Sequence, residues 1–243
     1  MNHRRDIWAV VPVKRLRFSK RRLAPLLSRA ERIALARAML QDVLAALRQA
    51  ARLAGVLVVT VDDAVAAIAR GADARVLTDE KNAGITPAVA AAARHLASTG
   101  VNTMLVVPAD VPLITPQDIE AIVSTQRTLP GVTLVPAAYD GGTNALLCSP
   151  PDAVPFRFGE ESFSSHQRAA QDLGIAPEVL RPARVGLDID RPEDLIAFLS
   201  APSPTRAYAC LSEMGIPARV ADRTRARSER SQRMLPSAAG ISS

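Results

Sequence analysis

The chain has 243 residues, of which 48% are apolar and only 3% aromatic, and its formal net charge is +6. This length fits one α/β domain with an appendage, whose core must be filled by aliphatic side chains and alanine. The longest apolar runs are far shorter than a membrane-spanning helix, and the first residues do not have a signal-peptide pattern. Cys148 and Cys210 form neither a metal-binding pair nor a disulfide framework. We therefore expect a cytoplasmic protein with reduced thiols that does not act at a membrane.

Strand-like and helix-like segments alternate along the first 200 residues. Apolar runs predict strands at residues 7–13, 56–61, 75–78, 104–108, 132–138, 144–148 and 180–189. Helical spacing and capping residues predict helices at residues 29–53, after 62–63, and at 87–98, 116–127 and 192–199. Strands that are separated by helices form a mostly parallel sheet with both faces covered. We therefore predict an α/β fold whose ligands lie at the carboxyl ends of the strands.

The regular pattern ends at about Ser200, where Pro202, Pro204 and Pro217 interrupt it. Residues 201–243 carry seven arginines against three acidic residues. Segments of this composition bury too little apolar surface to offset the entropy of ordering. We predict one domain at residues 1–200 and a basic, Pro/Ser/Arg-rich extension at residues 201–243 that is largely disordered.

A loop with six cations follows the first predicted strand and precedes a long helix: Lys14, Arg15, Arg17, Lys20, Arg21 and Arg22. Apart from this loop, residues 1–200 are net acidic, so the positive charge of the domain is local. A basic loop between a strand and a helix is a typical phosphate site in α/β proteins. A solvated surface loop is the alternative, and we expect Arg17 and Arg21 to face water.

Three aspartates follow predicted strands. Asp110 comes after the strand at 104–108, and Asp188 and Asp190 lie at the end of the one at 180–189. Residues two apart on an extended segment point to the same side, and carboxylates this close repel unless a cation lies between them. A divalent metal between phosphate oxygens would explain all three. Alternatively, Asp110 ends a turn before Pro112, and Asp190 caps the last helix.

A glycine-containing turn and a following loop carry small polar groups. Thr143, Gly159 and Ser162 offer hydroxyls and a backbone amide to a carboxylate or phosphate, and glycine allows close approach of the backbone. An ordinary hairpin turn and loop is the alternative. His166 either caps a helix or contacts an acceptor, although such a histidine is more often a solvated surface residue.

Taken together, these residues resemble the CofC/FbiD guanylyltransferases, which make part of the deazaflavin coenzyme F-420. The resemblance covers about residues 6–200 in order. It rests on these motifs: Pro12-Val-Lys14, Ser19-Lys20-x-Arg22, Glu31-Arg32, Pro108-Ala-Asp110-x-Pro112, Gly142-Thr143-Asn144, Phe158-Gly159-x-x-Ser162 and Asp188-x-Asp190-x-Pro192-x-Asp194.

The resemblance implies a fold, a reaction and a set of site residues. The fold is the three-layer, Rossmann-like sandwich of the nucleotide-diphospho-sugar transferase type. The reaction is attack by the phosphate of phosphoenolpyruvate, 2-phospho-L-lactate or 3-phospho-D-glycerate on the α-phosphorus of GTP, releasing pyrophosphate. The partners are GTP and the phospho-acid, with a second copy of the chain as a possible partner in a homodimer.

The resemblance also assigns roles to individual residues. It implies that Lys14, Lys20 and Asp110 are catalytic. The implied nucleotide contacts are Pro12, Val13, Lys14, Lys20, Arg22, Asp79, Gly84 and Pro108. Mg²⁺ would be held by Asp110, Asp188 and Asp190, and the phospho-acid by Thr143, Gly159 and Ser162. Family members usually carry an asparagine soon after the glycine that Gly84 matches, whereas this chain has Ile85-Thr86-Pro87.

Two other functions stay open. A nucleotidyltransferase that acts on a molybdenum cofactor or a sugar phosphate usually has a glycine-rich loop after the first strand, and residues 14–22 contain no glycine. A nucleic-acid-binding protein would use the basic extension, but residues 219–233 lack interleaved aromatic residues. Truncation at residue 200 is expected to leave an enzyme active and to remove nucleic-acid binding.

Overall fold

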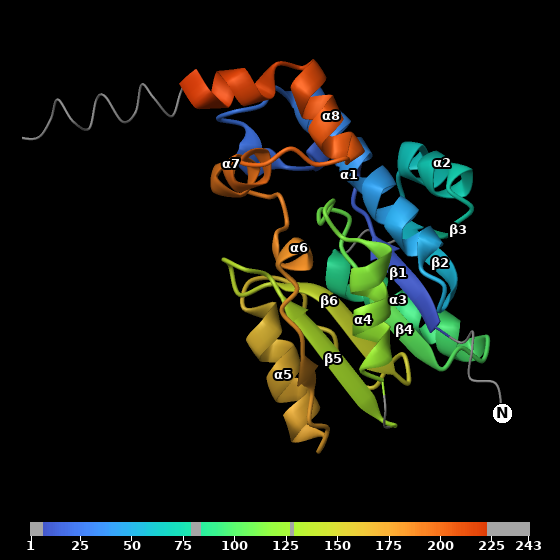
Figure 1. The fold of residues 1–243 in the computed structure, drawn as a ribbon. Helices are drawn as coiled ribbons and strands as arrows, with labels where there is room; N and C mark the ends of the chain where they lie inside the picture. Colours follow the sequence, from blue (N-terminus) through green and yellow to red (C-terminus); the bar gives the residue numbers. More distant parts are fainter. Residues whose placement is uncertain (1–6, 79–83, 127–128, 223–243) are drawn as a thin grey trace, which may run out of the picture.

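The structure, a computed structural model, describes residues 7–78, 84–126 and 129–222. A seven-stranded sheet in the order β3-β2-β1-β4-β6-β5-β7 forms its centre (Figure 1). The strands are β1 Ile7–Pro12, β2 Leu53–Thr60, β3 Arg75–Thr78, β4 Thr103–Val106, β5 Gly131–Pro136, β6 Thr143–Ser149 and β7 Glu178–Val179. β6 pairs antiparallel with β4 and β5, and the other described pairs are parallel. The predicted α/β fold with a mostly parallel sheet is confirmed.

Helices cover both faces of the sheet, which gives three layers. The helices are α1 Arg29–Gln49, α2 Asp63–Gly71, α3 Ile85–Ser98, α4 Pro116–Ser124, α5 Ser162–Asp172, α6 Ala183–Gly186, α7 Pro192–Leu199 and α8 Arg206–Glu213. Successive strand residues point to opposite faces, so Ala9 and Val11 lie in one buried core and Val10 in the other. The first core is covered by α1, α2, α4, α7 and α8, and the second mainly by α3 and α5.

The predicted capping residues begin three of these helices. Ser28 and Glu31 form a capping box at α1, and Thr115 and Asp118 form one at α4. Asp62 Oδ1 accepts a hydrogen bond from Ala64 N of α2 at 3.0 Å. These local signals fix where the helices begin, and thereby where the preceding loops must turn.

The predicted strand at residues 180–189 is wrong. β7 contains only Glu178–Val179, and residues 183–186 form the single helical turn α6. Pro182 cannot donate a ladder hydrogen bond, and Asn144 Nδ2 donates to the carbonyls of Val185 and Gly186 at 2.9 and 3.2 Å. Val185 and Ile189 are buried although neither belongs to a strand, which is why the pattern resembles that of a strand. Smaller differences are the earlier ends of α1 and α4, at Gln49 and Ser124.

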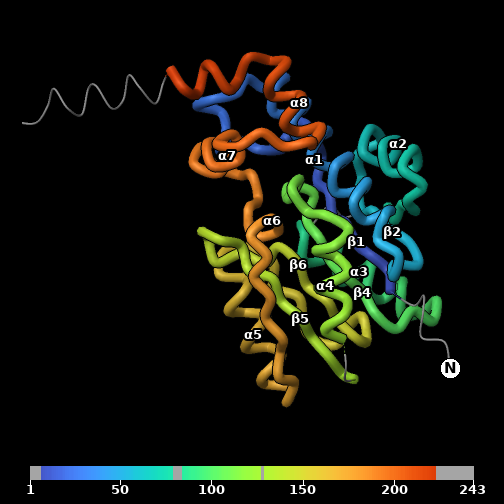
Figure 2. The backbone as a smooth tube through the Cα atoms, viewed as in Figure 1, coloured from blue at the N-terminus to red at the C-terminus, as the bar shows by residue number. Residues whose placement is uncertain are grey.

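The folded domain continues past Ser200. α8 packs against α1, with its first residues beside Gln41 and Asp42, and Arg219 of the helical residues 216–222 reaches Glu31 in the first turn of α1. These helices lie at the end of the molecule where the basic loop also lies (Figure 2). Leu211 and Ile216 are fully buried, and Asp42 Oδ2 accepts a hydrogen bond from Ala207 N at 2.8 Å. The predicted boundary at residue 200 therefore falls short of the structured part by at least 22 residues. The expected disorder of residues 223–243 lies outside the described residues.

None of the helices in the described part of the chain is long and apolar enough to cross a membrane.

Candidate active site

The carboxyl ends of the central strands bring the predicted site residues to one edge of the sheet. Lys14 follows β1, and Asp110 follows β4. Because β6 runs in the opposite direction, its first residues, Thr143 and Asn144, lie at this same edge. The reversal of a single strand thus places hydroxyl and amide groups opposite the basic loop.

An open cavity at this edge has two halves. The half under the basic loop has a volume of about 330 Å³, and the half that reaches β6 and α5 has a volume of about 430 Å³. Both are lined by Pro12, Lys14, Arg22, Ile85, Pro108, Asp110 and Asp190. Thr143, Gly159, Ser162 and Asp188 line only the second. The cavity therefore collects almost all of the predicted residues.

The basic loop is held in place by buried leucines and by a carboxylate. Leu16 and Leu23 lie in the core, each in a short 3₁₀ helix, and Leu16 N donates to Asp62 Oδ2 at 2.9 Å. Lys20 separates the two 3₁₀ helices and has a left-handed backbone, with φ of +55°. This turn points its side chain into the cavity, where only 8% of the side chain is exposed.

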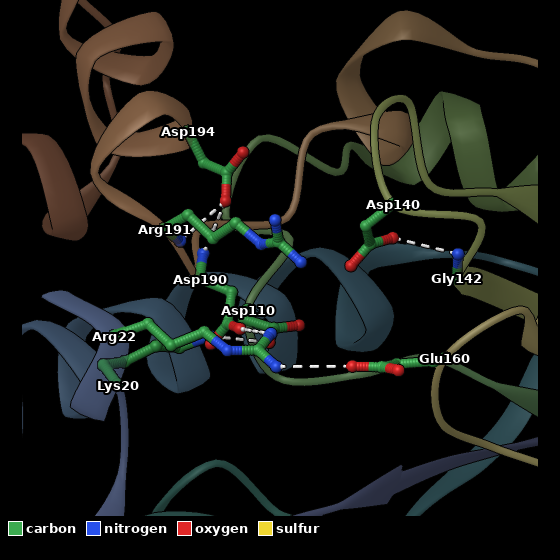
Figure 3. A network of polar contacts seen from close by, with 9 residues as sticks. All are labelled: Lys20, Arg22, Asp110, Asp140, Gly142, Glu160, Asp190, Arg191 and Asp194. Carbon is green, nitrogen blue, oxygen red and sulfur yellow. Dashed lines mark hydrogen bonds and ion pairs between the residues drawn. The ribbon is translucent and has the colours of Figure 1, made fainter.

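Lys20 contacts two of the three predicted metal ligands (Figure 3). Its Nζ lies 2.6 Å from Asp110 Oδ2 and 3.6 Å from Asp190 Oδ1. Burial disfavours the charged ammonium, but the charges of Asp110 and Asp190 outweigh it and raise the pKa of Lys20. Arg22 Nη1 donates to Asp190 Oδ2 at 2.9 Å. We call Lys20, Asp110, Asp188 and Asp190 the acidic cluster.

Asp188 belongs to the same cluster but is held from the other side. Asn144 Nδ2 donates to its Oδ1 at 3.0 Å, and Ile189 N donates to the backbone carbonyl of Asp110 at 2.9 Å. Burial, and then the negative charge of Asp110, raise the pKa of Asp188 to about 6. The cluster therefore holds more negative charge than Lys20 neutralises.

One further observation bears on a metal. Asp110 Oδ1 is buried and has no hydrogen-bond partner. In the described ranges, no group of three or more His, Cys, Asp or Glu side chains is already gathered as a metal site, and Lys20 contacts two of these carboxylates instead. Carboxylate oxygens are the ligands that Mg²⁺ takes in proteins, and the unpartnered oxygen is where a cation fits.

Asp190 is not the cap of α7, contrary to the alternative interpretation. Asp194 Oδ2 accepts hydrogen bonds from Asp190 N and Arg191 N at 3.1 and 2.7 Å (Figure 3). Asp194 thus stabilises the start of α7, and the side chain of Asp190 is left for the cavity.

The opposite side of the cavity carries neutral groups. Thr143 Oγ1 lies 3.1 Å from His166 Nδ1 and accepts a hydrogen bond from Ser162 Oγ at 3.1 Å. His166 is fully buried, so the expectation of a solvated surface histidine is wrong. Burial and the charge of Arg157 lower the pKa of His166 to about 4. We call Thr143, Ser162 and His166 the hydroxyl cluster.

The remaining predicted residues differ in their placement. Gly159 lines the cavity with φ of +143°, a conformation that favours glycine. Gly84, with φ of +114°, precedes α3 and lines a small recess with Pro12 and Val13. Lys14 is exposed and lines both halves. Asp79 lies outside the described residues.

Arg17 and Arg21 are exposed, as expected. Both guanidinium groups lie over the ring of Phe18, at 4.6 and 5.1 Å from its centroid. They stabilise the surface of the basic loop rather than its cavity side, although Arg21 also reaches the cavity lining.

Three residues in or behind the cavity have contacts that the sequence analysis did not predict. Asn144 orients Asp188, His166 contacts Thr143, and Arg191 lines the cavity with its guanidinium near Asp140 (Figure 3). An asparagine at the start of an otherwise apolar strand was a usable signal, because a buried amide needs partners. No comparable signal marks Arg191.

Known proteins with similar sequences are guanylyltransferases. A family profile described as "Guanylyl transferase CofC like" matches residues 7–233. A phosphoenolpyruvate guanylyltransferase of Conexibacter woesei is 38% identical over 79% of this chain and 86% of its own length. A 3-phospho-D-glycerate guanylyltransferase of Colwellia psychrerythraea is 38% identical over 79% and 92%. A phosphoenolpyruvate guanylyltransferase of Rubrobacter xylanophilus is 41% identical over 78% and 92%.

Solved structures with a similar fold are more distant in sequence. A nucleotide-diphospho-sugar transferase-type structure from Desulfovibrio desulfuricans G20 matches with a TM-score of 0.72 at 15% identity, over 88% of this chain and 98% of that one. A nucleotidyl transferase from Methanothermobacter matches with a TM-score of 0.60 at 17% identity, over 79% and 95%. These matches confirm the predicted nucleotidyltransferase-type fold.

Proposed function

The chain belongs to the CofC guanylyl transferase family, and we propose on this basis that it transfers GMP from GTP to a three-carbon phospho-acid. The acceptor is phosphoenolpyruvate, 2-phospho-L-lactate or 3-phospho-D-glycerate, and the product serves coenzyme F-420 biosynthesis in the cytoplasm. The observation that carries the proposal is a single cavity in which Lys20 and Asp110 lie opposite Thr143 and Ser162.

The proposed reaction needs no nucleophile from the protein, because the acceptor phosphate is already an anion. One of its oxygens attacks the α-phosphorus of GTP, and a new P–O bond forms. The bond from the α-phosphorus to the bridging oxygen breaks, and pyrophosphate leaves with the electron pair. Catalysis then consists of positioning two anions and neutralising their charge.

The cations of the cavity suit the triphosphate. Lys14 is exposed at the cavity without an ion pair to any described residue, and Lys20 and Arg22 are paired with aspartates. Phosphate oxygens can replace carboxylate oxygens as partners of all such groups. We assign Lys14, Lys20 and Arg22 to the triphosphate, with Pro12, Val13, Asp79, Gly84 and Pro108 as further nucleotide contacts.

Mg²⁺ is the proposed cofactor, held by Asp110, Asp188 and Asp190. The unpartnered Asp110 Oδ1 and the raised pKa of Asp188 both indicate an excess of negative charge in the acidic cluster. A bound divalent cation supplies electrostatic stabilisation of phosphoryl oxygens. Asn144 keeps the carboxylate of Asp188 oriented for this purpose through its hydrogen bond.

The hydroxyl cluster suits the acceptor. Thr143 and Ser162 line the larger half of the cavity, and Gly159 opens its backbone toward the same space. Hydroxyl and amide donors bind an anion without adding a charge that would hold the product too tightly. We assign Thr143, Gly159 and Ser162 to the phospho-acid.

The direct test is an acceptor panel. The purified full chain is incubated with GTP, Mg²⁺ and each of the three phospho-acids, and a hexose 1-phosphate serves as the acceptor of the alternative sugar-phosphate reaction. Pyrophosphate release and the product mass are measured together. We expect turnover with one or more phospho-acids, and turnover with none of the three contradicts the proposal. ATP and CTP in place of GTP test the choice of base.

The C-terminal extension calls for a revised truncation. A cut at residue 200 removes the buried Leu211 and Ile216, so it is expected to destabilise the domain whatever its function. A cut after residue 222 keeps every described contact and removes five arginines. An enzyme retains its turnover after this cut, whereas a nucleic-acid-binding protein loses salt-dependent binding of a DNA duplex. Light scattering of the same samples tests the proposed homodimer.

A further inference from the structure

The buried histidine of the hydroxyl cluster has no part in the proposed reaction. His166 of α5 is fully buried, and its ring packs edge-on against Phe158 with centroids 4.8 Å apart. Both ring nitrogens are hydrogen-bonded: Nδ1 lies 3.1 Å from Thr143 Oγ1, and Arg157 N donates to Nε2 at 2.9 Å. The histidine therefore bridges the loop before α5 and the first residue of β6.

The bond from Arg157 determines which nitrogen carries the proton. A backbone N–H can donate only to a nitrogen with a free lone pair, so Nε2 is unprotonated. A neutral imidazole then carries its proton on Nδ1. Burial and the charge of Arg157 keep the ring neutral by lowering the pKa of His166 to about 4. Nδ1 is consequently a donor, and Thr143 Oγ1 is its acceptor.

The same reasoning fixes the hydroxyl of Thr143. Its oxygen has two lone pairs, which accept from His166 Nδ1 and from Ser162 Oγ. The hydroxyl can still donate its own proton, and within the described ranges no further acceptor lies in hydrogen-bond distance of it. Thr143 lines the larger half of the cavity, and 6% of the residue is exposed. The hydroxyl proton is thus available to a ligand in the cavity.

We propose that His166 is a positioning residue that locks the Thr143 hydroxyl as a hydrogen-bond donor to an anionic oxygen of the acceptor. The inference rests on the proposed function, because the acceptor must be an anion. A hydroxyl without such a lock can also present a lone pair, which repels an anion. When the hydroxyl orientation is fixed before binding, this unproductive orientation is not populated. Binding the acceptor then costs no entropy for orienting the hydroxyl.

Two substitutions separate positioning from a purely structural role. The amide nitrogen of asparagine can lie near the position of Nδ1, so H166N keeps a donor to Thr143 but loses the acceptor for Arg157 N. Glutamine reaches the position of Nε2, so H166Q keeps that acceptor but loses the donor to Thr143. If His166 only holds the loop at Arg157, then H166Q is the better tolerated of the two. If His166 positions Thr143, H166N is the better tolerated variant.

The measured quantities are the KM values for the acceptor and for GTP, with thermal unfolding as the control for folding. We expect H166Q to raise the KM for the acceptor by about tenfold and to leave the KM for GTP unchanged, since one hydrogen bond to a charged group is affected. H166N is expected to stay within about threefold of the parent for both substrates. A larger loss in H166N than in H166Q overturns the proposal.

A double substitution tests whether His166 acts through Thr143. T143V removes the hydroxyl, so adding H166Q to it should raise the KM for the acceptor no further. Independent, multiplying effects contradict the proposal. Its failure is distinct from failure of the proposed function, because the latter appears as absence of turnover in the unsubstituted protein with all three phospho-acids. Fluorescence titration of the acceptor analogue phosphonoacetate supplies a readout without turnover, and equal affinity in H166Q and the parent also overturns the proposal.

Discussion

The acidic cluster brings three carboxylates and one ammonium to the edge of the sheet, whereas the hydroxyl cluster across the same cavity contains only neutral groups. In the first, a carboxylate oxygen of Asp110 is buried without a partner and the pKa of Asp188 rises to about 6. In the second, both nitrogens of His166 and the oxygen of Thr143 are fully hydrogen-bonded. One side is electrostatically incomplete, whereas the other is neutral and, among the described residues, lacks only an acceptor for the hydroxyl proton of Thr143.

The difference matches what each proposed ligand brings. A nucleotide that arrives with a divalent cation adds both signs of charge, so its side of the cavity can be completed only when it binds. A phospho-acid is an anion throughout, and fixed neutral donors receive it without reorganisation. We therefore expect substitutions in the acidic cluster to affect turnover and those in the hydroxyl cluster to affect acceptor binding.

Asp110→Asn carries the largest expected effect. It removes a charge from the acidic cluster, and kcat should fall by at least about 100-fold, as for the loss of a major electrostatic group. Folding should be retained, because the hydrogen bonds of Asp110 to other described residues are limited to the one from Lys20 and the one that its backbone carbonyl accepts from Ile189 N. Steady-state kinetics and thermal unfolding are measured together.

Asp118→Asn is the matched control. Asp118 is buried outside the cavity and accepts two hydrogen bonds from Arg184, both at 2.8 Å. Burial opposes its ionisation, but the bonds from Arg184 and Thr115 outweigh this and lower its pKa. D118N should lower the free energy of unfolding by about 1 kcal/mol, and the folded variant should keep the kcat of the parent. If D118N loses as much kcat as D110N, the acidic cluster has no special part in turnover.

The second prediction tests whether the hydroxyl cluster affects acceptor binding rather than turnover. Thr143→Val should raise the KM for the acceptor by about tenfold while kcat at saturation changes little, because a donor to the acceptor alone is lost. T143S keeps the hydroxyl and should stay near the parent. A fall in kcat with both KM values unchanged would place Thr143 with the acidic cluster, and the division of the cavity would be wrong.

Much of the acidic cluster was predictable from the sequence, and most of the hydroxyl cluster's internal bonding was not. Asp110 follows the buried strand β4 and so must lie at the carboxyl edge, whatever the details of packing. Asp188 and Asp190 reach the same edge from a segment that is not a strand, where Ile189 N donates to the carbonyl of Asp110. The contact between Thr143 and His166 depends on how the loop before α5 folds back on β6, which no local pattern encodes. The sequence therefore predicts that His166 is a surface residue, whereas the structure shows it fully buried.

The distinction between local signals and contacts distant in sequence also explains the errors in the predicted fold. Caps such as Ser28 with Glu31 are local chemistry, and the helix they begin is where the sequence predicts it. The helical turn at 183–186 is held in place by Asn144, about 40 residues earlier, whose Nδ2 donates to the carbonyls of Val185 and Gly186. α8 is ordered by the side chain of Asp42 and by apolar contacts with α1. Both depend on partners distant in sequence.

The third prediction concerns the charge excess of the acidic cluster. The ordinary pKa of an aspartate is 3.8, and that of Asp188 in the folded state is about 6. Between these values the folded state keeps a proton that the unfolded state has lost, so this group lowers stability as pH rises through this window. Asp188→Asn removes the effect, and without metal it should be more stable than the parent above pH 6 by up to about 3 kcal/mol, at about 2–4 °C in Tm for each kcal/mol.

Metal titrations test the same group from the opposite direction. Ligation requires the ionised carboxylate, so Mn²⁺ binding to the parent should weaken as pH falls below about 6, the pKa of Asp188. Thermal unfolding of the parent and D188N is measured at pH 4.5 and 8, with and without Mn²⁺. A Tm difference independent of pH, together with unchanged Mn²⁺ affinity, would remove Asp188 from the charge imbalance.

The smallest expected effect lies where the two clusters meet. Arg22 Nη1 donates to Asp190 Oδ2 at 2.9 Å, and its Nη2 lies 3.9 Å from Glu160 Oε1, beside Gly159 on the acceptor side (Figure 3). The side chain of Glu160 is 90% exposed, and ion pairs at such positions contribute little because water screens them. Glu160→Gln should therefore change either KM by less than about twofold. If it raises the KM for the acceptor as much as T143V does, Arg22 couples the two sides, and the acidic cluster organises acceptor binding as well as the nucleotide.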